Sequence, residues 1–220
     1  MSRPRITLAY AQTLDGRSAT ASGSSQWISG PESLRFAHAL RAGHDAIMVG
    51  VGTVLADDPR LTVRLTPGRD PLRVVADSAL RTPASAAVLR DGATAGTILA
   101  HTLAAPAVRR AALLAAGATL LELPEAAGGG VDLPALLAAL ADRGVGSLMV
   151  EGGARLVTAL LRARLADRLA VTVAPKILGA GTDAVGDLGI ARLGDAYALA
   201  DVRVTPYGPD LVIEGRLIYP

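Results

Sequence analysis

The sequence predicts an α/β fold, because short apolar runs alternate with longer stretches rich in alanine and leucine. Several of the apolar runs lack the inward/outward alternation of a half-exposed strand, which is typical of parallel strands buried on both faces. Close to the C-terminus, two further strand-like segments enclose Pro206, Gly208 and Pro209, and this turn composition predicts a hairpin.

The expected strands are short and spread over the whole chain, at residues 6–11, 45–49, 72–76, 96–100, 118–122, 147–151, 169–174, 198–205 and 210–219. Four helices are expected between them, and proline or glycine marks their ends. Three of them begin at or beside a proline and the fourth follows a glycine pair: Pro31, Pro106, Pro134 and Gly152–Gly153. The glycine run at residues 128–130 is interpreted as a loop within one domain.

Composition excludes several classes of function. The 220 residues contain no cysteine, so disulfides, thiolate metal ligands and cysteine nucleophiles are absent. The three histidines lack a zinc-binding spacing, and we expect no metal site. The net charge is +2 and aromatic residues make up 3%, too few to stack on nucleic acid. No apolar run would span a bilayer, so we expect a soluble, cytoplasmic protein that binds neither nucleic acid nor membrane.

Two polar segments near the N-terminus are the first candidates for a functional site. Residues 13–17 (TLDGR) leave the first expected strand, and their Asp-Gly pair indicates a turn. Residues 24–29 (SSQWIS) place Trp27 among small polar residues just before a helix start, where exposed N–H groups favour anions. A plain turn and a core tryptophan are the alternative interpretations.

The segment richest in functional side chains spans residues 50–64 (GVGTVLADDPRLTVR). It begins like the dinucleotide-binding G-x-G-x-x-G pattern, but Leu55 replaces the third glycine, so the motif is weak. Two carboxylates and two arginines follow within eight residues. If residues 61–65 are extended, Thr62 and Arg64 share one face, and the planar guanidinium of Arg64 could bind a phosphate. A solvated loop with surface ion pairs is the alternative.

A second glycine-containing turn lies at residues 150–156 (VEGGARL). An expected strand ends in Glu151, two glycines follow, and a helix begins. This order directs unpaired N–H groups at whatever lies over the end of the strand, which suits a pyrophosphate. Ligands of open α/β sheets also bind at the carboxyl ends of strands. The alternative is a tight turn with a solvated Glu151.

Together with residues 71–78 (PLRVVADS) and 174–179 (APKILG), these segments resemble the reductase domain of the bifunctional riboflavin-biosynthesis deaminase/reductase and its stand-alone relatives in archaea and fungi. They occur in the family's order from about residue 5 to the end, and ADDPRLTVR and VEGGA are the most specific. The resemblance implies a dihydrofolate-reductase-like, three-layer α/β/α fold with a mixed, mostly parallel central sheet and a C-terminal antiparallel hairpin. It also implies a single reductase domain over residues 1–220 and a homodimer.

The resemblance further implies an NADPH-dependent oxidoreductase of riboflavin biosynthesis. Such an enzyme delivers hydride to C1′ of the ribose of a phosphoribosylamino-pyrimidine and gives a ribitylamino product. Two substrates fit, 5-amino-6-(5-phosphoribosylamino)uracil and 2,5-diamino-6-ribosylamino-4(3H)-pyrimidinone 5′-phosphate, and both remain open.

The resemblance also implies site residues. NADPH should contact Ala11, Trp27, Thr53, Asp57 and Ser78, with its pyrophosphate on Gly152, Gly153, Ala154, Arg155, Leu156, Val157 and Thr158. The substrate should contact Ser25, Arg41, Leu61, Arg64 and Glu151. We add Arg81 for the 2′-phosphate that distinguishes NADPH from NADH. Glu151 can accept hydrogen bonds from sugar hydroxyls and, acting through a water, is the candidate catalytic group.

The chain departs from the family pattern in two places. Ala9 stands where the fused bacterial enzymes often carry a lysine in the first strand, so we expect one substrate contact to be absent. The H-x-E and P-C-x-x-C zinc signatures of the deaminase domain do not occur in the sequence.

Two alternatives remain open, one an enzyme on the same fold and one from a different class of function. A dihydrofolate or other pterin reductase would need a carboxylate on the first helix, which instead offers Arg35 and Arg41, with Glu32 only in its first turn. This charge pattern favours a phosphorylated substrate. A catalytically silent nucleotide-binding protein on the same fold is the second alternative, since fold alone does not establish function.

Overall fold

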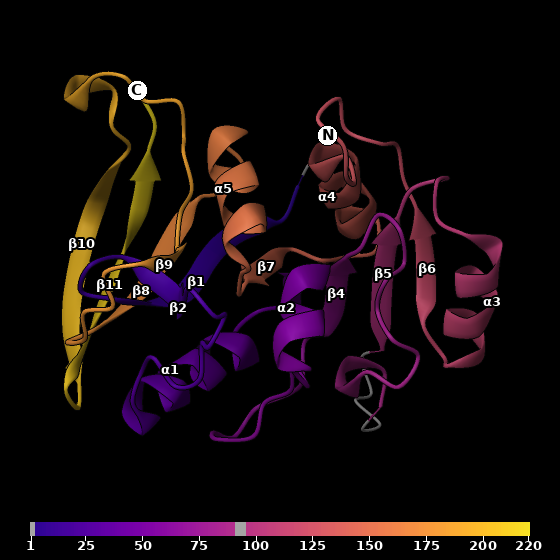
Figure 1. The fold of residues 1–220 in the computed structure, drawn as a ribbon, viewed down its shortest axis with the longest axis horizontal. Coiled ribbons are helices and arrows are strands. Elements are labelled where there is room, and N and C mark those ends of the chain that lie inside the picture. Colours follow the sequence, from indigo (N-terminus) through magenta and orange to yellow (C-terminus); the bar gives the residue numbers. More distant parts are fainter. Residues whose placement is uncertain (1–2, 91–95) are drawn as a thin grey trace. The chain divides into compact units, whose positions relative to one another are not determined.

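The computed structural model describes residues 3–90 and 96–220, and it confirms an α/β architecture with mixed strand pairing (Figure 1). The chain divides into two compact units. Unit 1 comprises the residues up to Arg5 and Ala39–Leu148, and unit 2 comprises Ile6–His38 and Met149–Pro220. The expectation of a single domain stays a prediction, because a compact unit is not by itself an independently folding domain.

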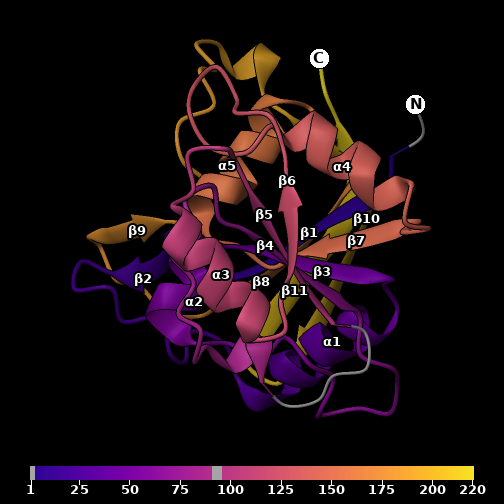
Figure 2. The ribbon, with the colours of Figure 1, turned by 90° about the vertical axis from the view of Figure 1, so that its right-hand side faces the viewer.

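Unit 1 is built on four parallel strands. Its elements are β3 (Ala46–Gly50), α2 (Val51–Asp57), β4 (Leu72–Ala76), the 3₁₀ turn η1 (Ala87–Leu89), β5 (Thr97–His101), α3 (Ala107–Ala115), β6 (Thr119–Glu122), α4 (Leu133–Ala141) and the start of β7 (Ser147–Val150). The strands pair in the order β3–β4–β5–β6. Helices α2 and α3 lie on one side of these strands and α4 on the other, which gives the three expected layers (Figures 1 and 2).

Both faces of β3, β4 and β5 are buried, whereas the edge strand β6 is partly exposed. On one face, Val49 and Val75 pack in a cluster that includes Leu113 of α3. On the other face, Met48 and Val74 are also fully buried. The missing alternation in the sequence therefore indicated a strand buried on both sides, as inferred.

Unit 2 carries the antiparallel part of the fold. Its elements are β1 (Arg5–Thr13), β2 (Arg17–Thr20), α1 (Pro31–Ala42), the end of β7, α5 (Ala154–Arg162), β8 (Arg168–Ala174), β9 (Gly181–Asp183), the 3₁₀ turn η2 (Leu193–Asp195), β10 (Ala198–Tyr207) and β11 (Asp210–Ile218). The strands pair in the order β10–β11–β8–β1, and only β1 and β8 are parallel. The predicted C-terminal hairpin is confirmed.

Helix ends follow the sequence signals closely. Pro106 is the N-cap of α3, and Gly117 follows the helix with a φ of +86°, a conformation that glycine adopts without strain. Helix α4 begins after Asp132, whose carboxylate accepts a hydrogen bond from the N–H of Ala135 at 2.8 Å.

Three expectations need correction. Residues 51–57, where no helix was expected, form helix α2, because burial of Val51 and Val54 outweighs the low helix propensity of Gly52. The short antiparallel pair β2–β9 was not predicted. The C-terminal hairpin is also tighter than expected, since β10 continues to Tyr207.

The hairpin turn caps helix α1. Asp210 is 2% exposed, and its Oδ2 accepts hydrogen bonds from the N–H of Gly30 and the hydroxyl of Ser33, both at 2.7 Å. The ring of Tyr207 lies 5.0 Å from that of Phe36 on the helix. The turn and α1 therefore fix the end of the segment that carries Trp27.

No helix within the described residues is long and apolar enough to cross a membrane.

Candidate functional site

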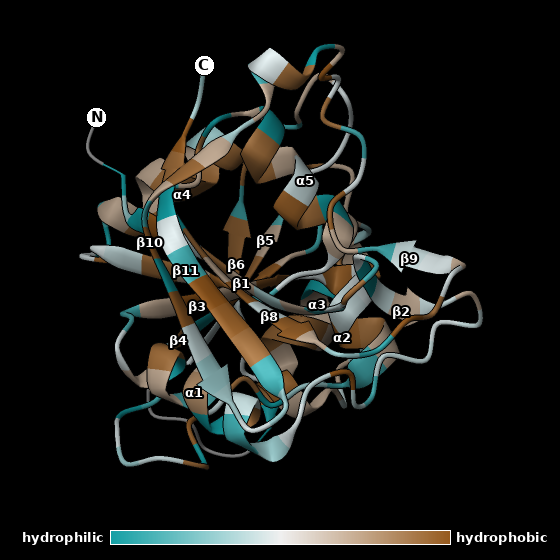
Figure 3. Cartoon of the chain, turned by 90° about the vertical axis from the view of Figure 1, so that its left-hand side faces the viewer, coloured by the Kyte–Doolittle hydropathy of each residue, from teal (hydrophilic) through white to brown (hydrophobic). Residues whose placement is uncertain are grey.

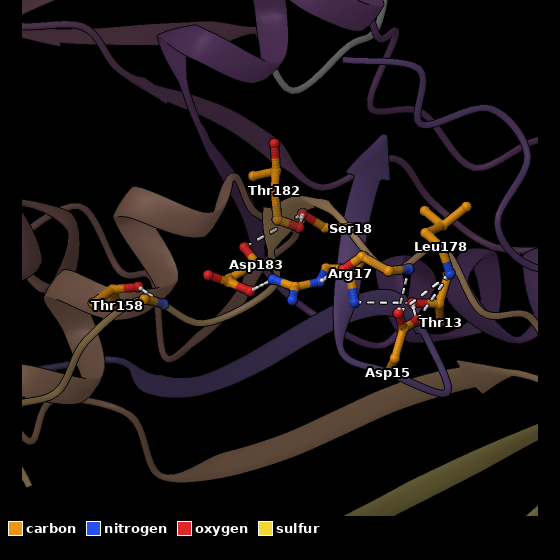
Figure 4. Close-up of polar contacts among 10 residues, drawn as sticks. Thr13, Asp15, Arg17, Ser18, Thr158, Leu178, Thr182 and Asp183 are labelled. Atoms are coloured by element: carbon orange, nitrogen blue, oxygen red, sulfur yellow. Dashed lines mark hydrogen bonds and ion pairs between the residues drawn. The ribbon is translucent and has the colours of Figure 1, made fainter. Parts of the chain in front are cut away.

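The TLDGR segment forms the expected turn between β1 and β2, and Asp15 organises it (Figure 4). Asp15 accepts hydrogen bonds from the hydroxyl of Thr13 at 2.6 Å and from the N–H of Gly179 at 2.7 Å. These bonds, the Thr13 hydroxyl first, lower the pKa of Asp15 to about 2. The carboxylate therefore stays ionised and joins the β1 turn to the segment after β8.

Arg17 ties the same turn to β9. Its guanidinium donates to the carbonyl of Gly179 at 3.0 Å and forms an ion pair with Asp183 (Figure 4). The TLDGR and APKILG segments, which are far apart in the sequence, are thus one hydrogen-bonded structure in unit 2.

Ala11 and Trp27, two expected cofactor contacts, lie in unit 2. Ala11 is half-buried on β1 opposite Thr172 of β8. The preceding residue, Tyr10, has its pKa raised to about 12 by burial and is uncharged at neutral pH. Trp27 is 66% exposed, so the core interpretation of this tryptophan is wrong. Its carbonyl accepts a hydrogen bond from the Lys176 ammonium at 2.8 Å.

The segment from Ser25 to α1 also carries an expected substrate contact. Ser25 is half-buried, and Ala9 is 5% exposed on the same strand as Ala11. A side chain at position 9 therefore points into a packed region, where the alanine fits without a polar group to satisfy.

The turn after β7 has the geometry that its glycines predict. Gly152 is buried with a φ of +109°, which side chains rarely tolerate, and nothing lies within 4 Å of the position a Cβ would take. The Gly152–Gly153 peptide bond is cis. Glu151 is half-buried at the end of the strand. Helix α5 follows, and its N-cap, Gly153, provides no side chain to bind the first N–H groups.

Helix α5 buries one face and exposes the other. Leu156 and Val157 are buried, Arg155 is exposed, and Ala154 is half-buried at the first turn. The hydroxyl of Thr158 donates to the carbonyl of Ala154 at 2.7 Å and accepts from the N–H of Gly186 at 2.8 Å. Thr158, an expected cofactor contact, therefore holds the loop after β9 against the helix.

In unit 1, two expected substrate residues converge on one threonine. Arg41, in the last turn of α1, donates through Nη1 to the carbonyl of Thr62 at 3.0 Å. Arg64 donates through its own Nη1 to the same carbonyl at 3.2 Å and to the Thr62 hydroxyl at 2.6 Å. Two guanidinium groups are thus held beside one neutral acceptor, an arrangement of donors that suits an anion such as phosphate. From the sequence, Thr62 was expected only to share a face with Arg64; its role as acceptor for both arginines was not predicted.

The loop that carries Arg64 is not the extended segment we considered. Leu61 has a left-handed φ of +57° and is 1% exposed, so its side chain belongs to the core. Thr62 beside it is buried too, whereas Leu65 is 48% exposed. The N–H of Val63 donates to Asp70 at 2.6 Å and fixes the loop. Any ligand contact of Leu61 must therefore come from its backbone.

Helix α2 holds two expected cofactor contacts. Thr53 and Asp57 are both half-buried. Asp58 ends the helix in the left-handed region with a φ of 40°, and its carboxylate accepts from the N–H of Ala87 at 2.7 Å. The second aspartate of the ADDP motif is therefore structural.

A tight turn after β4 presents Ser78 and Arg81. Asp77 is fully buried, and its Oδ2 accepts from the N–H and hydroxyl of Thr82 at 2.7 and 2.8 Å. Within this turn Ser78 is half-buried and Arg81 is exposed. Arg109 of α3 donates to the carbonyl of Ala79 at 3.1 Å, which adds a second arginine to this turn.

The expected site residues fall into two groups. Arg41, Thr53, Asp57, Leu61, Arg64, Ser78 and Arg81 belong to unit 1, whereas Ala11, Ser25, Trp27, Glu151 and the Gly152–Thr158 segment belong to unit 2. Arg41 and Arg64 are brought together within unit 1. Their assembly with Glu151 in one pocket stays a prediction. In the part of the chain that the structure describes, no three His, Asp or Glu side chains form a metal-binding cluster.

Comparison with known proteins gives one family. The family model described as the RibD C-terminal domain matches residues 4–213. The 2,5-diamino-6-ribosylamino-4(3H)-pyrimidinone 5′-phosphate reductase of Methanothermobacter thermautotrophicus is 45% identical over 218 residues, covering 96% of this chain and 97% of that protein. The riboflavin biosynthesis protein RibD of Aquifex aeolicus is 40% identical over 212 residues, covering 96% of this chain and 57% of that protein.

Solved structures agree with this comparison. Acinetobacter baumannii RibD superposes with a TM-score of 0.84 at 27% identity, covering 98% of this chain and 58% of that chain. This chain thus spans little more than half the length of the two RibD proteins compared. A dihydrofolate reductase from Enterococcus faecalis superposes with a TM-score of 0.53 at 14% identity, covering 96% of each chain. The dihydrofolate-reductase-like fold is confirmed.

Proposed function

Since the chain belongs to the RibD C-terminal domain family, we propose that it is an NADPH-dependent reductase of riboflavin biosynthesis. Its substrate is the 5′-phosphate of a ribosylamino-pyrimidine, either the uracil or the diaminopyrimidinone form. Hydride is added at C1′ of the opened ribose and a proton is taken up, so that the ribosylamino group becomes a ribitylamino group and NADPH becomes NADP⁺.

The observation that carries this proposal is the convergence of Arg41 and Arg64 on Thr62. Guanidinium groups bind phosphate oxygens in pairs of parallel hydrogen bonds, and a dianion relieves the repulsion between two neighbouring cations. Thr62 holds the two arginines in place before the ligand arrives, so little side-chain freedom is lost on binding. We assign the substrate phosphate to this pair, with Ser25 and the backbone of Leu61 as further contacts.

NADPH, which supplies the hydride, fits the turn after β7. The open space at Gly152 and the uncapped first turn of α5 suit a pyrophosphate, because backbone N–H groups bind its oxygens. We therefore assign the pyrophosphate to the backbone of the Gly152–Thr158 segment. Further contacts are assigned to Ala11, Trp27, Thr53, Asp57 and Ser78, and the 2′-phosphate is assigned to Arg81.

Glu151 is proposed to orient the substrate. At the end of the strand its carboxylate can accept hydrogen bonds from ribose hydroxyls, and through a water it can transfer a proton. Most of the rate enhancement then comes from holding the nicotinamide and the ribose C1′ close together in the reactive orientation. A pH–rate profile of Glu151→Gln that matches the wild type would remove the proton-transfer role.

A homodimer is part of the proposal. Several apolar side chains of the two C-terminal strands are exposed, namely Val202, Val204, Leu211 and Ile218. Val204 pairs with Ile213 and Pro206 pairs with Leu211, so Val204 and Leu211 lie on one face of the hairpin, and alternation along β11 places Ile218 on the other. Brown, hydrophobic stretches are visible on the hairpin in Figure 3. Exposed apolar groups of this kind favour association with a second copy, which sedimentation measurements would detect. The cytoplasmic location stays a prediction.

The deciding experiment is an assay of NADPH oxidation with each of the two pyrimidine phosphates, with the ribityl product identified by mass spectrometry. We expect turnover of at least one of them. Turnover of dihydrofolate alone would instead support a pterin reductase. NADPH binding without turnover of any of the three compounds would support a silent nucleotide-binding protein.

A further inference from the structure

Lys176 is the only lysine of the chain, and it connects two segments of unit 2. It lies in the exposed segment just after β8. Its Nζ donates hydrogen bonds to the carbonyl oxygens of Trp27 at 2.8 Å and of Ile28 at 2.7 Å. One ammonium group thus binds two successive carbonyls of the segment that precedes α1.

The backbone that carries Lys176 is itself firmly held. The Lys176 carbonyl accepts from the N–H of Leu14 at 2.8 Å, and its N–H donates to the carbonyl of Ala174 at 2.8 Å. Three residues further on, Gly179 is bound to Asp15, as described above. The ammonium therefore extends from a fixed base, and the bonds it makes restrain the segment at its other end.

The orientation of Trp27 is fixed by few other contacts. Its side chain is 66% exposed, so packing against the core does little to fix its orientation. The Asp210 cap fixes the chain only from Gly30 onward. A compact ammonium with three donors can serve two adjacent carbonyls, whereas the planar fork of an arginine is shaped for carboxylates and phosphates.

We propose that Lys176 is a positioning residue that holds Trp27 in the orientation in which it contacts the cofactor. The inference rests on the proposed function, because it takes Trp27 as a cofactor contact. It goes beyond that function by assigning a role to the APKILG segment: Lys176 joins the SQWIS segment to the TLDGR turn through the backbone bonds of residues 176–179.

The first test uses the fluorescence of Trp27, the only tryptophan of the chain. Lys176→Met removes the donors and keeps an apolar stem of similar length, and Lys176→Arg keeps the charge. Arg192→Met, at an exposed loop position of the same unit, is the matched control for loss of one charge. In the protein without ligand, we expect Lys176→Met to lower the anisotropy of Trp27 and to increase its quenching by uncharged acrylamide. Arg192→Met should match the wild type, and Lys176→Arg should lie between the two.

The second test is an NADPH titration and a steady-state assay of the same variants. We expect Lys176→Met to weaken NADPH binding about tenfold, the loss expected for charge-assisted hydrogen bonds that act through a neighbouring residue. At saturating NADPH, kcat and the substrate KM should stay close to wild type. Lys176→Arg should bind NADPH more tightly than Lys176→Met. Such a partial recovery would not be expected if the loss came only from a structural defect. Circular dichroism confirms that each variant is folded.

Two results would overturn the inference. Unchanged anisotropy and quenching in Lys176→Met would show that Lys176 does not restrain Trp27. Altered fluorescence with unchanged NADPH affinity would show that the restraint does not serve the cofactor. A wild-type protein that fails to bind NADPH would overturn the proposed function and the cofactor role together, and the ligand-free fluorescence would still decide whether the tether exists.

Discussion

The turns that follow β3 and β7 look alike in sequence but differ in structure. Each has glycines after an apolar strand and before a helix. In unit 2, Gly152 has a φ of +109° and opens onto the uncapped start of α5. In unit 1, Gly50 is extended with a φ of −79°, and Gly52 lies within α2 without a positive φ. A glycine is therefore required at position 152, whereas position 52 has neither a conformation nor a close neighbour that requires one.

Because their conformations differ, the two turns would contact ligands through different groups. After β7, backbone N–H groups at the helix start are the proposed ligand contacts. After β3, the proposed contacts are side chains: Thr53 and Asp57 on α2 for the cofactor, and Arg64 in the loop beyond the helix for the substrate phosphate. Ligand binding by backbone groups should be sensitive to the conformation of the turn, whereas ligand binding by side chains should be sensitive to loss of their charge. The following variants test this contrast.

The largest effect is expected for Arg64→Ala. Loss of a charge-assisted hydrogen bond to phosphate costs about 1.5–3 kcal/mol, so the substrate KM should rise at least about tenfold while NADPH affinity barely changes. Steady-state kinetics with both ligands measure this. Arg69→Ala removes an equal charge from an exposed position of the same loop and should leave KM unaltered. If Arg64→Ala loses NADPH binding instead, the substrate phosphate and the cofactor have been assigned to the wrong turns.

Gly152→Ala should be almost as damaging, by a conformational route. A Cβ at a φ of +109° is strained whatever the surrounding space, at a cost of about 1–3 kcal/mol. We expect a lower free energy of unfolding in urea and weaker NADPH binding, with the affinity of the substrate phosphate retained where the variant is folded. An unchanged unfolding midpoint together with wild-type NADPH affinity would show that this turn does not need glycine.

Gly52→Ala should have a smaller effect of opposite sign. The added Cβ meets nothing within 4 Å, and alanine in place of a helical glycine stabilises by about 0.5–1 kcal/mol. Chemical denaturation should therefore give an equal or higher free energy of unfolding, with normal ligand affinities. Impaired NADPH binding in this stable variant would reveal a close backbone approach to the cofactor in unit 1.

The smallest expected effect is on stability at low pH, where two carboxylates with lowered pKa values become protonated. The pKa of Asp15 in unit 2 is lowered from 3.8 to about 2, chiefly by the Thr13 hydroxyl, and the pKa of Asp45 in unit 1 is lowered chiefly by the Ser147 hydroxyl. A lowered folded-state pKa stabilises the protein above pH 3.8, and this contribution is lost as the pH falls toward 2. Thermal unfolding of Asp15→Asn should therefore depend less on pH between about 4 and 2 than that of the wild type. Parallel curves would contradict the assignment.

Sequence reasoning succeeded where local chemistry decides. Pro106 and Gly117 mark the ends of α3 because a fixed φ and a left-handed residue act over one helical turn. It failed at α2, where two buried valines outweigh a poor local propensity.

Long-range contacts were also beyond the sequence. The Asp210 cap on α1 joins residues that are 177 positions apart, and no local pattern encodes it. The role of Thr62 depends on the left-handed φ of Leu61, which redirects a segment that looks extended. Arg64 was predicted to bind phosphate from its own segment and Arg41 was named from the family resemblance, but their common acceptor emerged only from the fold.

The cap provided by Asp210 has a consequence for synthesis on the ribosome. Helix α1 is translated well before its capping carboxylate, because Asp210 lies 177 positions further along the chain than Ser33. Strand β1 likewise pairs with β8, which is also translated late. Most of unit 1, by contrast, is one continuous stretch from Ala39 to Leu148 and has all its strand partners as soon as that stretch emerges. The nascent chain can therefore complete the parallel core first, while the segment bearing the tryptophan is capped only after β11 has been made.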